Sequence, residues 1–511
     1  GSCWKIIINW QKAYKMAKQS LKDKTVKDIG NLQQSTELCI GALSGAICDE
    51  MERYRALQGS PEKLLLLTSE LRMDVEFVMM DLNTSFLACC KETTPYAIRY
   101  HIKNLNSSIT EAFKAIHGFG KAGKKTVWAR LGKALEDRSV CHYTEQASLI
   151  NSFQEAEKRM LDMERKLDDK ENRDLTYHYD SNMREVYQLM VESNNMEEAS
   201  QRLIDFMGVL QEALKLCEKV EECLRNNGVD TKVEIGAVQN LDDTHTLAIV
   251  QQLRKNEELK KVFTDVLNDV KPIDDQATHI LRFEKLESMT AGTVELPEIG
   301  NVFTMLNIWM MLYFMRADVA AITKAIVMSS TCGEALLNMR RYMINIAAVF
   351  GQLFGYNDNQ RQCSHWTSIK AMLPIDNREL KEEAARIEGL LKQVTPKRDE
   401  DLRTCYVHYY DNKTMLSNVP NIVSALTAHD LEHEMQRANL MLRVMGLVRD
   451  YLNDVMTILA KQAHDANEKS TKELKATLEK VRSIAESDKC PEALKEKLKG
   501  VVEMVERAVR V

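Results

Sequence analysis

The sequence has little proline and little glycine, with eight prolines and twenty glycines among its 511 residues. Both residue types are common at the tight turns between short strands, so their scarcity argues against a β-rich fold and favours long helices. The twenty-six methionines agree with this reading, because methionine forms helices readily and fills irregular cores. We therefore predict an all-α protein.

A long hydrophobic run and a strong excess of one charge are also missing. The longest apolar stretch, from Val302 to Met315, is followed at once by Arg316 and Asp318, which is typical of a buried helix rather than a membrane span. A net charge of −6 argues against a basic protein that coats nucleic acid. We expect no nucleic-acid partner.

The twelve cysteines have no regular spacing. A chain of this length can bury a core without disulfides, so reduced, buried thiols in a cytoplasmic protein are the simplest interpretation.

Residues 61–128 recur approximately at 297–366. A forward shift of 236 to 238 positions aligns the two stretches almost without gaps, and such a constant offset is typical of a duplicated module. The matching pairs include Pro61 and Pro297, Asp81 and Asp318, Thr94 and Thr331, Phe113 and Phe350, Gly118 and Gly355, and Trp128 and Trp366.

We predict an all-α fold with two related multi-helix bundle modules and long antiparallel, partly coiled-coil-like helices. The first module covers residues 3–228, where Asn226-Asn227-Gly228 has the residues of a helix C-terminus. Residues 229–296 are the least periodic part and predict an irregular to helical linker. Residues 297–466 form the second module, and 467–511 a C-terminal helical hairpin.

Two segments have the heptad-like spacing of helices that pack along a narrow apolar seam. The first lies between Tyr143 and Glu171, and the second follows Asn467. Their apolar positions are Leu149, Phe153, Ala156, Met160, Met163 and Leu167 in the first segment, and Leu494, Leu498, Val501, Val505 and Ala508 in the second.

One basic segment lies between residues 114 and 133, where six cations occur with no acid among them. A solvated helix face is the ordinary explanation, and contact with an anionic membrane surface or a phosphate-bearing partner is the functional one. The candidate anion or lipid contacts are Lys114, Lys121, Lys124, Lys125, Arg130 and Lys133.

The same segment contains a glycine-rich motif, GFGKAGKKT at 118–126, which includes G-x-G-x-x-G and nearly fits the phosphate-loop pattern. A phosphate loop follows a strand, whereas a helix is expected here, and the second copy lacks these glycines. We interpret the motif as a helix–helix turn.

Two groups of side chains have the types that hold zinc. His429, Glu432 and His433 fit H-x-x-E-H, an inverted zinc-peptidase pattern. The other group has loose spacings and consists of Cys363, His365, Cys405 and His408. Nothing comparable to the first group occurs in the other copy, so we predict ordinary histidines and thiols, and neither a metal nor a cofactor.

Tyrosine clusters recur as YHYD at 177–180 and HYYD at 408–411. Hydrogen-bonded tyrosines at a packed helix junction explain them, and a paired ligand site is the alternative. No G-x-S-x-G motif, kinase motif set or convincing Cys/His nucleophile pair is present, so no catalytic residue is predicted.

These patterns favour a non-enzymatic scaffold or adaptor whose exposed helix faces bind other proteins or form a homodimer. The first alternative is a membrane-acting helical bundle that binds anionic lipid through basic segments near 5–27 and 114–133. The second is an enzyme with a metal or phosphate site that its motifs do not reveal.

Overall fold

The computed structural model describes residues 26–120, 125–167, 186–187, 190, 195–236, 241, 244–275, 297–372, 377–394, 406–411, 414, 416–487 and 491–509. Within these ranges the chain is all-helical, as the composition predicts, and its only β-feature is an isolated bridge between Tyr410 and Ser417. No helix of the described ranges combines the length and the hydropathy needed to cross a bilayer.

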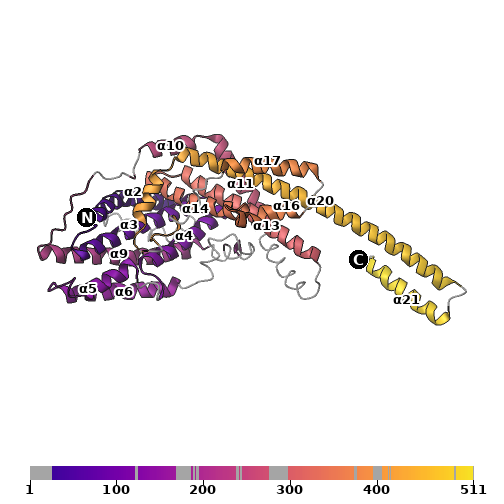
Figure 1. Ribbon diagram of the computed structural model, residues 1–511, viewed down its shortest axis with the longest axis horizontal. Coiled ribbons are helices and arrows are strands. Elements are labelled where there is room, and N and C mark those ends of the chain that lie inside the picture. The colour runs from indigo at the N-terminus through magenta and orange to yellow at the C-terminus, as the bar shows by residue number, and fades with distance from the viewer. Residues whose placement is uncertain are drawn as a thin grey trace.

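The N-terminal helices surround α3, which contacts four of them (Figure 1). From Leu64 to Cys89 almost every residue of α3 is buried, because its sequence is apolar on more than one side. The helix α3 is therefore the central helix of this group. The helices of this part are α2 (Val26–Ala56), α3 (Lys63–Lys91), α4 (Pro95–Ile116), α5 (Val127–Glu136), α6 (Gln146–Leu167) and α9 (Met196–Asn226).

The later helices surround α13 in a similar way, since α11, α14 and α20 all pack against it. These helices are α10 (Thr244–Arg254), α11 (Glu257–Asp275), α13 (Pro297–Val327), α14 (Cys332–Leu353), α15 (Asp358–Gln362), α16 (His365–Ala371), α17 (Arg378–Val394), α19 (Val419–Thr427), α20 (Leu431–Glu486) and α21 (Glu492–Val509).

One of the predicted boundaries lies within a helix. The region 229–296 contains α10 and α11, which both pack on α13. Residue 467, the expected start of a separate hairpin, lies within α20, which continues unbroken from Leu431 to Glu486. The second bundle and the C-terminal hairpin therefore share one helix.

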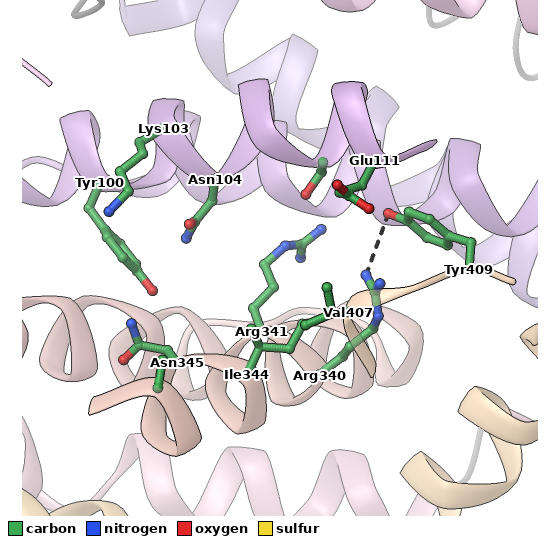
Figure 2. Close-up of a pocket in the computed structure, with 12 residues that line it drawn as sticks. Tyr100, Lys103, Asn104, Glu111, Arg340, Arg341, Ile344, Asn345, Val407 and Tyr409 are labelled. Carbon is green, nitrogen blue, oxygen red and sulfur yellow. Dashed lines mark hydrogen bonds between the residues drawn. The ribbon is translucent and has the colours of Figure 1, made fainter. Parts of the chain in front are cut away.

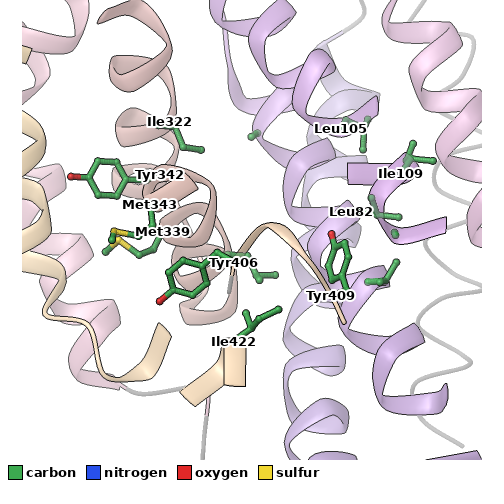
Figure 3. Packing of buried hydrophobic residues seen from close by; sticks show 14 of the residues in the cluster. Leu82, Leu105, Ile109, Ile322, Met339, Tyr342, Met343, Tyr406, Tyr409 and Ile422 are labelled. Atoms are coloured by element: carbon green, nitrogen blue, oxygen red, sulfur yellow. The ribbon is translucent and has the colours of Figure 1, made fainter. Parts of the chain in front are cut away.

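The two groups of helices meet where α3 and α4 face α13 and α14. Figure 3 shows Leu82, Leu105 and Ile109 on one side of this core and Ile322, Tyr342 and Met343 on the other. Because buried residues form one continuous cluster, both groups contribute to a single hydrophobic core.

The helices α4 and α14 have 22 residues each and similar ends. Each follows a threonine, Thr94 or Thr331. At the end of α4 the N–H of Gly118 donates to the carbonyl of Phe113, and at the end of α14 the N–H of Gly355 donates to the carbonyl of Phe350. Both glycines have positive φ, 81° and 77°, a conformation that favours glycine after a helix.

The two tryptophans near the starts of α5 and α16 also have similar contacts. The Trp128 Nε1–H donates to the Glu157 carboxylate on α6. The Trp366 Nε1–H donates to Glu388 on α17 at 3.0 Å. Each indole therefore ties a short helix to the next longer helix in the chain.

Candidate functional site

The C-terminal part of the molecule extends away from the bundle as a two-helix arm, which we define as residues 461–486 of α20 together with α21 (Figure 1). The two helices pack against each other and bury Ala485 and Val502. Large apolar side chains of the arm stay exposed: Leu474 by 39%, Ile484 by 57%, Leu494 by 45%, Val501 by 46% and Met504 by 63%.

A buried polar network joins α3 to α14 in the centre of the bundle. The Asp81 carboxylate accepts hydrogen bonds from Arg340 Nη1 at 2.6 Å and from Arg341 Nη2 at 2.5 Å. It also accepts a hydrogen bond from the Tyr409 hydroxyl. Burial raises the pKa of Tyr409 well above its usual value, and the nearby charge of Asp81 adds to this rise, so the phenol remains a donor.

Beside this network lies a cavity of about 40 Å³ between α4 and α14 (Figure 2). The helix α4 contributes Tyr100, Lys103, Asn104, Ser108 and Glu111, α14 contributes Arg340, Arg341, Ile344, Asn345 and Ala348, and the segment after α17 contributes Val407 and Tyr409. Hydrogen-bond donors predominate in this lining, and Glu111 is its only acid.

Two donors of the lining have no hydrogen-bond partner within the described residues, Arg341 Nε and Asn104 Nδ2. Arg341 is only 7% exposed, and leaving a buried donor without an acceptor costs about 1–3 kcal/mol. Burial also lowers the pKa of Lys103, and the charge of Asp318 partly offsets this effect. The cavity therefore contains donors that could bind an acceptor from outside the chain.

The basic segment of α4 and α5 is only partly available for binding. Arg130 makes a bidentate ion pair with the buried Glu70, at 2.9 and 2.6 Å, so its guanidinium already has an anionic partner. Lys114 lies 3.9 Å from Glu111, and Lys125 and Lys133 are exposed. Lys121 and Lys124 lie outside the described residues.

The glycine-rich motif follows α4 and precedes α5, as expected for a connection between helices. The Thr126 side chain caps α5 by accepting a hydrogen bond from the N–H of Ala129. Residues 121–124 of this motif lie outside the described residues.

The described members of the two zinc-like patterns lie in different surroundings. His429 Nε2 lies 2.6 Å from the Tyr406 hydroxyl, whereas His433 is exposed. Cys363 is exposed and His408 lies 3.5 Å from Glu111, while Cys405 is outside the described residues. Within the described part of the chain, no three His, Cys, Asp or Glu side chains are arranged to hold a metal ion.

The second tyrosine cluster does belong to the polar centre, since Tyr409 binds Asp81 and Tyr410 is buried. Its counterpart at 177–180 lies outside the described residues. No sequence pattern indicated a role for Lys103, Arg340 or Arg341. Two adjacent arginines within the largely apolar helix α14 were the available signal, because buried arginines require partners.

Comparisons of this chain with protein-family models, with curated proteins and with solved structures found no match.

Proposed function

We propose that this protein is a non-enzymatic helical scaffold, built from a duplicated module, that forms a homodimer through its C-terminal arm. The observation that carries the proposal is the set of five half-exposed apolar side chains on a hairpin that extends beyond the bundle. Exposed apolar faces of this kind on soluble proteins mark interaction sites.

The duplication is supported by helices of the same order and by equivalent contacts at aligned positions. The helices α3 and α4 correspond to α13 and α14, and α6 and α9 correspond to α17 and α20. Packing of α3 on α9 has its counterpart in packing of α13 on α20. The glycine-ended helices and the two indole–carboxylate hydrogen bonds lie at the positions that the offset aligns.

The arm has the properties of half of a four-helix bundle. Two helices alone cannot cover each other's apolar stripes, and a second hairpin completes the core. Finishing the burial of five half-exposed side chains contributes on the order of 5 kcal/mol per arm. For two arms this gain is comparable to the cost of association, so we expect a concentration-dependent dimer.

The charges of the arm favour a second copy of the chain as the partner. Between residues 461 and 509 there are eleven lysines and arginines and ten aspartates and glutamates. A surface with balanced, interspersed charges can pair with a copy of itself in a twofold arrangement, whereas it has little net attraction for an anionic membrane.

Light scattering coupled to size-exclusion chromatography over a concentration series tests this proposal. We expect the wild-type mass to rise toward that of a dimer. The double substitution Ile484→Lys with Met504→Lys changes two exposed positions and should keep the protein monomeric at every concentration, because the charges would have to be buried.

The matched control is Leu38→Lys, since Leu38 is 64% exposed but lies on α2 in the bundle. It should dimerise like the wild type. A wild-type protein that stays monomeric, or an arm variant that dimerises normally while circular dichroism shows it folded, would contradict the proposal.

A further inference from the structure

The cavity between α4 and α14 is lined by equivalent positions of the two aligned stretches. At an offset of 237, its lining residues pair as Lys103 with Arg340, Asn104 with Arg341, Ser108 with Asn345 and Glu111 with Ala348. The cavity therefore lies where the two helix pairs face each other, and each helix contributes cations or amides to it.

The polar groups of the two helices converge on the same space. Figure 2 shows Lys103 and Asn104 pointing from α4 toward α14, and Arg341 pointing from α14 toward α4. Lys103 and Asn104 are half-buried, so this end of the cavity can be reached from solvent. Glu111 lies eight residues along α4, about 12 Å away at the helical rise, and nearer to Tyr409.

The charges around the cavity leave its donor-rich end suited to an anion. Asp81 is shared by two guanidiniums, Arg340 and Arg341, which bind its two carboxylate oxygens. The carboxylate of Glu111 has two basic side chains near it, with His408 Nδ1 at 3.5 Å and Lys114 Nζ at 3.9 Å. Asp318 of α13 also lies close enough to affect Lys103, and it accepts a hydrogen bond from the Tyr96 hydroxyl at 2.7 Å.

We propose that this cavity binds a small oxyanion, such as phosphate or a carboxylate, between Lys103, Asn104 and Arg341. This inference is independent of dimerisation through the arm. A volume of about 40 Å³ holds only a few water molecules or a group of similar size, which excludes a nucleotide or a sugar as a whole.

The donor pattern favours an oxyanion over water alone. Lysine and arginine only donate, and among the described residues neither the Asn104 amide nitrogen nor the Arg341 Nε has an acceptor. A water molecule must also find acceptors for its own hydrogens, whereas an oxyanion accepts at every oxygen. Hydrogen bonds from charged donors to an anion are also stronger than those to a neutral acceptor.

Isothermal titration calorimetry of the full chain with inorganic phosphate and with acetate, each against chloride at equal ionic strength, tests the inference. We expect saturable binding of at least one of the two anions at one site per chain. The anion that binds identifies the group that the cavity accepts. If neither produces a saturable signal, the cavity holds water and the inference is wrong.

Two variants locate the binding. Asn104→Leu removes a donor that has no hydrogen-bond partner in the described part of the chain, so the fold should be retained while anion affinity falls about tenfold or more. Lys103→Met removes the ammonium group but keeps the apolar stem, and should weaken binding to a similar degree.

The matched control is Lys114→Met, which removes a lysine from the same helix outside the cavity lining. Its affinity should stay within about twofold of the wild type. Binding that is unchanged in both Asn104→Leu and Lys103→Met, or lost equally in Lys114→Met, would overturn the assignment to this cavity.

Discussion

The buried carboxylates of α3 show how single side chains are accommodated in this core. Glu70 pairs with Arg130, Asp74 accepts a hydrogen bond from the Ser417 hydroxyl, and Asp81 binds two arginines. Glu76 differs, because its Oε2 has no hydrogen-bond partner within the described residues. Burial raises the pKa of Glu76 to about 8, and the nearby charge of Glu50 adds to the rise.

Glu76 should make the protein less stable as the pH rises. The pKa of Glu76 is about 8 in the folded protein and 4.5 ordinarily. The contribution of the protonated carboxyl to the free energy of unfolding is therefore full below pH 4.5 and is lost as the pH rises through 8. Glu76→Gln keeps the shape without the ionisation. At pH 7 it should stabilise the fold by on the order of 2–3 kcal/mol, and by much less at pH 4.5.

Thermal unfolding monitored by circular dichroism at both pH values measures this difference. Glu70→Gln serves as the control, because Glu70 is buried but paired with Arg130. This substitution should lower the unfolding temperature at pH 7. An equal effect of Glu76→Gln at both pH values would show that the ionisation of Glu76 does not control stability.

At the scale of helices, the polar network determines how α3 and α14 are held together. Most of the contact between the two helix groups is apolar, and apolar contacts have no preferred direction. Asp81, in contrast, accepts hydrogen bonds from Arg340 and Arg341 in fixed directions. The guanidinium of Arg340 also lies 4.5 Å from the centre of the Tyr409 ring. The network therefore fixes the register of α14 on α3.

The substitution Asp81→Asn should destabilise the protein by about 3–5 kcal/mol, because it leaves two buried guanidiniums without a counter-charge. The comparison is Asp318→Asn at the aligned position on α13. The hydroxyl of Tyr96 can still donate to asparagine there, and half-buried Lys103 retains access to water. We expect a loss of about 1 kcal/mol.

Denaturant-induced unfolding of the two variants distinguishes these cases. Losses of similar size would mean that the charge of Asp81 is no more important than that of Asp318, and that the register of α14 depends on apolar packing alone.

At the scale of the whole molecule, a buried bundle contrasts with an exposed arm that continues from one of its helices. The helix α20 buries its first half against α13 and α17, and from residue 461 onward its described side chains are mostly exposed. Backbone hydrogen bonds in such a segment open far more easily than those of α3.

Hydrogen–deuterium exchange measured by mass spectrometry at low and high protein concentration tests this contrast. Peptides from α3 should exchange slowest at both concentrations. Peptides from the arm should exchange quickly at low concentration and more slowly at high concentration, where a second arm covers them. Exchange in the arm that does not depend on concentration would argue against the dimer.

The fold class and several local features could be predicted from the sequence. The scarcity of proline and glycine, the apolar surface of the α3 segment and the Asn226–Gly228 helix end depend on residues close together in the chain. Five of the six heptad-like residues of α6 are also buried, all except the half-buried Phe153, and α6 packs on α9.

Only the tertiary structure decided which charged side chains meet. Asp81 and Arg340 are separated by 259 positions, and no local pattern indicates which faces of α3 and α14 touch. The same holds for the cavity, which requires α4 and α14 to be placed side by side, and for Arg130, whose partner Glu70 lies on another helix. Helix formation depends on neighbours in the chain, whereas pairing of buried charges depends on packing between distant segments.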